Sequence, residues 1–284
     1  MYKFVSLLLC CTILSCNATE SPIISKNITE RLRPALSGAI SGAASAFVYA
    51  PFHYAQNQSA QGLKIDWKKI HYCWRGYTIV ACNNIPPFAA QALVYALINN
   101  RSHGDSDSKN PNTKTTIAAF IAGACTAPFT NACQLLTVHK QNTGLPVHTI
   151  INGFPHSYKS LRRGMLPTTL QGMLFVTTYT NGLPFIKNKI HHYYGNGPVA
   201  LVSSACLSSI LLTITTQPLR VMATKLHADI EKKQYKGLMD VIKKTIQVHG
   251  IKGPYAGATY RTAGNIFALP VINSTQQVLN NIKI

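Results

Sequence analysis

The chain has 284 residues and a formal net charge of +19, yet only 12% of its residues are charged and 46% are hydrophobic. This balance excludes collagen-like and highly charged disordered proteins, and the mean hydropathy of +0.08 lies between soluble and fully lipid-buried chains. The sequence has no Gly-x-x-x-x-Gly-Lys phosphate loop, Gly-x-Ser-x-Gly elbow or His-Glu-x-x-His zinc helix, so no enzyme of these classes is indicated.

Residues 1–34 form an N-terminal extension. A lysine precedes an apolar run that ends near Cys16, which is the form of a secretory signal peptide. The run could equally be an amphiphilic extension before a first membrane span, because Pro22 and a polar stretch to Arg33 separate the two. Both interpretations remain open from the sequence.

Three later segments have the length and composition of membrane helices with one polar face. Each mixes Ser, Thr, Asn or Gln with apolar residues over about the 20 residues that a bilayer requires. The segments are residues 36–51, 116–136 and 201–219. We expect the polar face of each helix to line a cavity.

The same local pattern occurs three times along the chain. A proline lies within or at the end of each predicted span, and a glycine follows further on, in two copies directly after an arginine. This recurrence predicts three tandem repeats at residues 35–110, 111–195 and 196–284. The prolines are Pro51, Pro128 and Pro218, and the glycines are Gly76, Gly164 and Gly257.

This pattern resembles the mitochondrial carrier family, whose repeats carry a Pro-x-acid-x-x-base motif followed by an acid-Gly and an aromatic-base-Gly motif. The third repeat is the closest copy, running from Gln217-Pro218 through His249-Gly250 to Tyr255-Ala256-Gly257. The resemblance covers about residues 33–282 and implies an all-α membrane protein with a six-helix pseudo-threefold bundle. Each repeat would contain a transmembrane helix broken near its proline, a short surface helix and a second transmembrane helix.

Small residues recur at equal distances before each proline. Small side chains four residues apart let a neighbouring helix backbone approach closely in lipid. We therefore expect close helix contacts at Gly38 and Gly42, at Thr115 and Ala119, and at Ala205 and Ser209.

The charged residues are distributed unevenly. No acidic residue falls within a proposed span, whereas the excess of Lys and Arg raises the local concentration of anions. An anionic substrate is therefore expected, although contact with an anionic lipid such as cardiolipin would explain the same excess. Proton relays in membranes use buried acidic groups or histidines, so a proton-driven mechanism is not indicated. The acidic residues are Glu20, Glu30, Asp66, Asp105, Asp107, Asp229, Glu231 and Asp240.

The gate positions depart from the family pattern. In carriers, the acid and base that follow each proline form ion pairs that close the matrix end of the cavity. Because no such pair is available here, and neutral hydrogen bonds are weaker than charge-assisted ones, we expect a shallower closed state. The predicted kink positions are the three prolines, and the acid and base positions hold His53 and Gln56, Thr130 and Cys133, and Arg220 and Ala223.

The resemblance also implies where substrate would bind. The family's contact points lie on the second helix of each repeat, and Gln171-Gly172-Met173 resembles the Gln-Gly-aliphatic contact of adenine nucleotide carriers, with an apolar slot for a base. Ordinary helix packing around a glycine is the alternative. Phosphates would be held by Arg261, with Arg220 and Lys225 at the cavity floor. The contact positions are Asn83, Asn84, Gln171, Gly172, Gly264 and Asn265.

Together these observations predict a transporter of an anionic metabolite, most plausibly ATP or ADP, across the mitochondrial inner membrane by alternating access at one central site. No catalytic residue, cofactor, metal site or nucleic-acid partner is expected. A carrier scaffold without gates, acting as an interaction partner or a leak, is one alternative. A carrier for another phosphorylated or carboxylate anion and an exported lipoprotein are others. The atypical extension fits a pathogen-encoded member of the family acting in a host cell.

Overall fold

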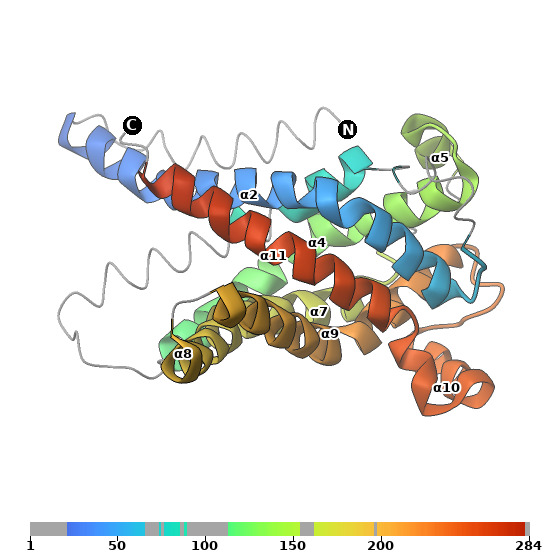
Figure 1. Ribbon diagram of the computed structural model, residues 1–284. Helices are drawn as coiled ribbons and strands as arrows, with labels where there is room; N and C mark the ends of the chain where they lie inside the picture. Colours follow the sequence, from blue (N-terminus) through green and yellow to red (C-terminus); the bar gives the residue numbers. More distant parts are fainter. Residues whose placement is uncertain are drawn as a thin grey trace.

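The computed structural model describes residues 22–65, 74, 77–85, 88–89, 113–153, 162–195 and 198–281, and the regular structure in these residues is helical, as predicted (Figure 1). A short helical stretch at 77–85 precedes α4. The elements are α2 (Pro22–Gln61), α4 (Thr113–Thr143), α5 (Val147–Asn152), α7 (Met165–Thr177), π-helix η2 (Thr178–Gly182), α8 (Leu183–Tyr194), α9 (Pro198–Ala228), α10 (Leu238–His249), 3-10 helix η3 (Gly250–Tyr255) and α11 (Ala258–Asn281).

Three helices of the described part are long and apolar enough to cross a membrane. Their candidate spans are Ala35–Gln61, Thr116–Thr143 and Val202–Ala228, which belong to α2, α4 and α9. These spans confirm the first helix predicted for each repeat. The six-helix pseudo-threefold arrangement stays a prediction, because the second helix of the first repeat falls largely outside the described residues.

The described helices are not interrupted at the three repeat prolines, so the predicted complete break is not observed, and a kink at these positions stays a prediction. Helices α4 and α9 continue through Pro128 and Pro218, and α2 includes Pro51. A proline removes one backbone hydrogen bond, and neighbouring helices can compensate for this local loss inside a membrane protein. Helix α2 also begins at Pro22, so it includes residues that we had assigned to the extension. A proline fits the first helical turn, where the N–H group has no acceptor.

The long helices pack in the order α2, α11, α9, α7 and α4, and hydrogen bonds between α2 and α4 close this ring at one end. Helix α11 lies along α2, α4 lies along α7, and both α7 and α11 pack on α9 (Figure 1). Small residues permit the close contacts, as predicted: a Cβ on Gly42 would lie 2.9 Å from the Phe88 ring, and Ala119 packs against Val176. The last described helix therefore meets the first, and the ring encloses a central space.

Two repeat glycines are explained by their backbone and their neighbours. Gly164 and Gly257, which precede α7 and α11, have left-handed φ values of 79° and 75°. A Cβ at Gly164 would lie 2.5 Å from His227 Nε2, and one at Gly257 would lie 2.9 Å from the Gln56 carbonyl oxygen. Only glycine meets both conditions without strain, which accounts for its recurrence in the repeat motif.

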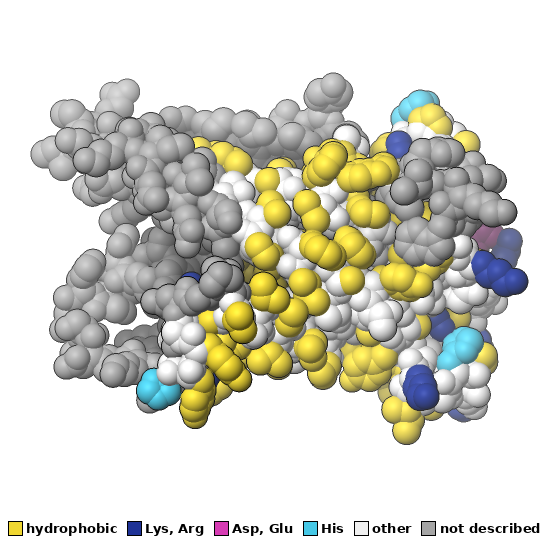
Figure 2. Space-filling view, in the orientation of Figure 1, with side chains coloured by type: hydrophobic (Ala, Val, Ile, Leu, Met, Phe, Trp, Pro, Cys, Tyr) yellow, Lys and Arg dark blue, Asp and Glu magenta, His cyan; other side chains and the backbone are white. Residues whose placement is uncertain are grey.

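The outer and inner faces of the ring have the polarity of a membrane protein. Apolar side chains cover the middle of the surface, and Lys and Arg gather at the end that carries α10 (Figure 2). Phe47, Ile121 and Val202 are 59%, 58% and 63% exposed, whereas Ser41 and Ser45 are fully buried or nearly so. Apolar groups therefore lie on the outside and polar groups on the inside. This arrangement agrees with the polar helix faces predicted from the sequence.

Candidate substrate site and gate

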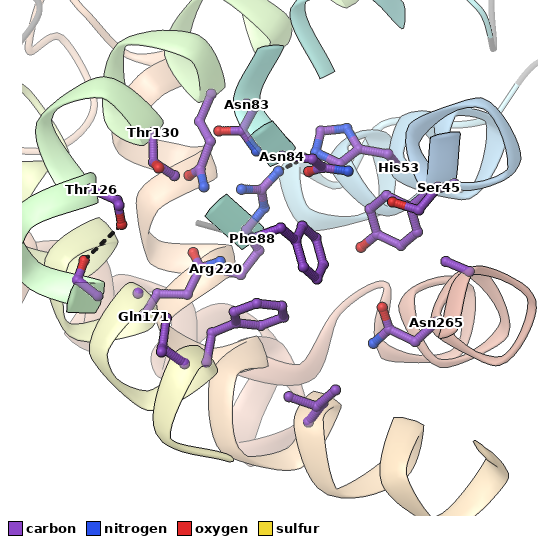
Figure 3. A pocket seen from close by; sticks show the side chains of 18 of the residues that line it. Ser45, His53, Asn83, Asn84, Phe88, Thr126, Thr130, Gln171, Arg220 and Asn265 are labelled. Atoms are coloured by element: carbon purple, nitrogen blue, oxygen red, sulfur yellow. Dashed lines mark hydrogen bonds between the residues drawn. The ribbon is translucent and has the colours of Figure 1, made fainter. Parts of the chain in front are cut away.

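The ring encloses a central cavity of about 110 Å³. Its lining comes from α2, the 77–89 segment, α4, α7, α9 and α11, and it combines polar groups with the aromatic rings of Phe88 and Phe175 (Figure 3). Met173, Gly264, Gln56, Lys225 and the three repeat prolines are not among the lining residues. The predicted site residues that the structure brings together here are His53, Asn83, Asn84, Gln171, Gly172, Arg220, Arg261 and Asn265.

Two buried guanidinium groups give this cavity its charge. Arg220 and Arg261 are 4% and 5% exposed. Arg220 Nη2 donates to His53 Nε2, and Arg261 Nη1 donates to Gln217 Oε1 at 3.2 Å. Among the described residues, no ion pair involves either arginine. Because buried charges normally require a counter-charge, the cavity is suited to an anion that supplies one.

One glutamine links the helices that hold these arginines. Gln217 Oε1 also accepts a hydrogen bond from Gln56 Nε2 at 3.0 Å, and Gln217 Nε2 donates to the Ala256 carbonyl at 2.6 Å. Gln217 therefore connects α2, α9 and the start of α11. Sequence reasoning missed this residue, although it directly precedes the third repeat proline.

Uncharged amides join the ends of the spans nearest α5. Asn57 Nδ2 donates to Gln141 Oε1 at 2.7 Å, and Gln58 Nε2 donates to Asn142 Oδ1 at 3.1 Å. Asn142 Nδ2 donates in turn to Gln61 Oε1 at 2.8 Å. We call Gln56, Asn57, Gln58, Gln61, Gln141, Asn142 and Gln217 the amide gate. Of the acid and base positions that the resemblance implies, Gln56 belongs to the amide gate, and His53 and Arg220 are joined to each other by a hydrogen bond beside it.

A second cavity of about 570 Å³ lies on the other side of the amide gate. Gln61, Asn142 and Lys225 line it, together with the loop that follows α9. The gate residues thus separate the central cavity from this outer one. We had expected Lys225 at the floor of the central cavity, but the structure places it in the outer cavity instead. It lies five residues beyond Arg220, about 7.5 Å along the helix, and its Nζ donates to Thr245 Oγ1 at 3.0 Å.

The predicted contact glycines have packing roles in this structure. A Cβ on Gly123 would lie 2.5 Å from the Gly172 carbonyl oxygen, so α4 and α7 touch through backbone atoms. This contact fills the space beside Gly172 where we had expected an apolar slot for a base. Gly264 lies against the ring of Tyr49, 2.7 Å from where its Cβ would be. The packing alternative considered for Gly172 therefore accounts for its small size, and its role toward substrate stays a prediction.

A buried ion pair lies between the second and third repeats and was missed by sequence reasoning. Arg163 Nη2 contacts Asp229 Oδ2 at 2.8 Å, and their side chains are 7% and 8% exposed. Arg163 also donates to the carbonyls of Leu226 and Tyr235 at 2.9 and 2.7 Å. Burial lowers the pKa of Arg163, and the Asp229 carboxylate opposes that shift. The ion pair fixes the turn before α7 to the loop after α9.

The comparisons with known proteins agree with this architecture. A search of curated proteins found no match to the chain. Residues 195–278, which span α9, α10 and most of α11, match the family described as mitochondrial carrier protein. The matched segment is the repeat in which the sequence motif is most complete. This match supports, over the third repeat, the resemblance to the mitochondrial carrier family that was found from the repeat motifs.

Proposed function

We propose that this chain moves an anionic metabolite, with an adenine nucleotide as the leading candidate, across the mitochondrial inner membrane by alternating access. The observation that carries the proposal is the pair of buried arginines, Arg220 and Arg261, facing a cavity that the amide gate closes at one end. A bound anion would neutralise both charges, and its arrival would favour the conformation that holds it.

The lining of the cavity supports a nucleotide within the class of anions. Phosphate oxygens match the guanidinium donors of Arg220 and Arg261 in charge and geometry. Phe88 and Phe175 line the same cavity, with ring centroids 6.0 Å apart and an interplanar angle of 90°. An aromatic base would pack favourably against such rings. A phosphorylated or carboxylate anion without a base would use the arginines alone.

The amide gate supports movement between two states. Opening it would break neutral hydrogen bonds, each with a net contribution of about 0.5–1.5 kcal/mol, rather than buried ion pairs. It also weighs against the alternative of a carrier scaffold with no gate, because amide contacts join α2, α4 and α9 on one side of the cavity. Anionic lipid such as cardiolipin remains a proposed partner for the basic end of the molecule.

Uptake by purified protein tests this function directly. The full chain is reconstituted in liposomes and the initial rate of labelled ADP uptake is measured against ADP concentration. We expect saturable uptake that Arg261→Gln reduces by about 100-fold, because a buried charge contact is worth about 2–5 kcal/mol. Arg162→Gln is the control, since Arg162 is an exposed arginine. Non-saturable flux unaffected by Arg261→Gln would instead favour a leak.

A further inference from the structure

Four buried oxygen atoms around the central cavity have no hydrogen-bond partner among the residues that the structure describes. They are Asn83 Oδ1, Thr130 Oγ1, Gln134 Oε1 and Gln171 Oε1, and all four residues line the cavity. Thr130 and Gln134 are only 8% and 3% exposed. Buried polar groups are almost always paired, so a cluster of four such atoms facing one cavity indicates that a ligand completes them.

Other polar groups of α4 find partners inside the protein. Thr126 Oγ1 donates to the Gly123 carbonyl at 3.1 Å, and Thr137 Oγ1 donates to the Cys133 carbonyl at 2.8 Å. Asn131 Nδ2 donates to the Arg163 carbonyl at 3.2 Å. These polar groups of α4 are satisfied within the protein, although Thr126 also lines the cavity, whereas Thr130 Oγ1 and Gln134 Oε1 have no partner among the described residues.

The unpaired atoms lie beside the cationic part of the site. In Figure 3, Asn83, Thr130 and Gln171 lie to one side of the Arg220 guanidinium, and Ser45 and Asn265 lie to the other. An anionic group bound at Arg220 would therefore bring the adjacent part of the same ligand against these side chains.

From this arrangement we infer that Asn83, Thr130, Gln134 and Gln171 form a hydrogen-bonding wall that selects anions carrying an uncharged donor, such as a hydroxyl or an amine. Three of the atoms are amide carbonyl oxygens, which only accept hydrogen bonds. A hydroxyl or amine of the ligand pairs with them, whereas a bare phosphate or pyrophosphate presents further acceptors and leaves them unpaired.

This inference rests on the proposed anion site and extends it to residues that the family resemblance does not assign to substrate. The resemblance places contact points on the second helix of each repeat, whereas Thr130 and Gln134 belong to α4, the first helix of the second repeat. The wall therefore predicts that α4 contributes to specificity, while Arg220 and Arg261 provide the shared attraction for any anion.

Ligand-induced thermal stabilisation of the purified chain tests the wall. ADP and inorganic pyrophosphate are titrated separately, since both carry the same diphosphate group and only ADP carries hydroxyl and amine donors. We expect ADP to bind more tightly than pyrophosphate. Thr130→Val and Gln134→Leu should each weaken ADP binding by about tenfold and pyrophosphate binding by less than about twofold.

Thr137→Val is the matched control, because it removes a hydroxyl of the same helix that already has a protein partner and does not line the cavity. It should leave the ADP to pyrophosphate ratio unchanged. The unliganded melting temperature shows whether each variant is folded, and Thr130→Val keeps the side-chain shape if Gln134→Leu does not fold. Equal effects of Thr130→Val and Thr137→Val, or equal affinity of the wild type for both ligands, would overturn the wall and indicate that water pairs these oxygens. If neither ligand stabilises the wild type, the anion site itself is wrong.

Discussion

The buried arginines of this chain fall into two contrasting environments. Arg163 contacts a carboxylate and two backbone carbonyls, and Asp229 also accepts the backbone N–H groups of Lys233, Gln234 and Tyr235 at 2.8–3.1 Å. Arg220 and Arg261 are also buried, yet they donate to neutral acceptors, His53 Nε2 and Gln217 Oε1. The first site contains its own counter-charge, whereas no ion pair among the described residues neutralises the second.

This difference separates a structural charge from one available to a ligand. A buried ion pair that is fully hydrogen-bonded fixes two segments, and removing either member leaves the other uncompensated. A buried cation without a carboxylate is costly to the empty protein and becomes favourable when an anion binds. Stability and transport should therefore respond in opposite ways to mutation at the two sites.

The largest expected effect on stability is at the paired site. Arg163→Met leaves Asp229 buried without its counter-charge, and we expect the free energy of unfolding to fall by about 3–5 kcal/mol. Arg220→Met removes an uncompensated charge, so stability should be unchanged or higher while ADP uptake is lost. Thermal unfolding in detergent and uptake in liposomes measure the two quantities. Similar losses of stability in both variants would contradict the comparison.

Placing a carboxylate beside Arg220 should give it an ion pair like the one that Arg163 forms with Asp229. His53→Asp places an acid on α2 where the neutral imidazole now accepts from Arg220. The resulting ion pair between α2 and α9 would favour the closed gate and occupy the cation, so we expect uptake about tenfold slower. His53→Gln, which keeps a neutral acceptor, is the control and should retain most activity. Faster uptake in His53→Asp would show that the gate does not limit transport.

Weakening the amide gate should have a smaller effect of opposite sign. Gln141→Leu removes the hydrogen bond from Asn57 that joins α2 to α4. One neutral hydrogen bond contributes about 1 kcal/mol, so the open state should become about fivefold more populated. The initial uptake rate at limiting ADP measures this change. An unchanged rate would place the barrier to transport elsewhere in the molecule.

The smallest effect is expected at Asp240, a partly exposed acid of α10. The backbone N–H of Lys236 at 2.9 Å, and then the Lys244 ammonium, hold the pKa of Asp240 below its ordinary value of 3.8. Because folding lowers this pKa, the interaction stabilises the folded state at pH values above the ordinary pKa of 3.8. The stabilisation is lost as the pH falls through the folded-state pKa. Asp240→Asn should therefore lower the melting temperature slightly at neutral pH, and the difference should shrink in acid. A constant difference at all pH values would assign the effect to lost hydrogen bonding alone.

The parts of the fold that recur in the sequence were predictable. The three spans follow from apolar composition and the repeated prolines, and the glycines before α7 and α11 follow from a motif with a definite backbone requirement. Arg220, Arg261, Asn83, Gln171 and Asn265 were selected by their place in the repeat, and the structure brings them to one cavity. Whether they contact substrate stays a prediction.

The interactions between repeats were not predictable from one sequence. Arg163 and Asp229 are 66 residues apart, and neither spacing nor composition indicates that they meet. The amide gate escaped notice because Asn and Gln carry no charge pattern, and their pairing depends on how α2, α4 and α9 cross. Lys225 was misplaced for a related reason: its position along α9 determines which side of the gate it faces.

The contact between Gly123 and Gly172 has a mechanical consequence. Two backbones that touch at bare Cα positions leave no side chains interlocked at that point. A change in the angle between α4 and α7 would therefore meet no side chain at this contact, although Val176 packs against Ala119 on one side of it and Thr168 bonds to Asn131 on the other. A bulky residue at either glycine would push the two helices apart. We therefore expect the close packing of α4 on α7 to require glycine at both positions.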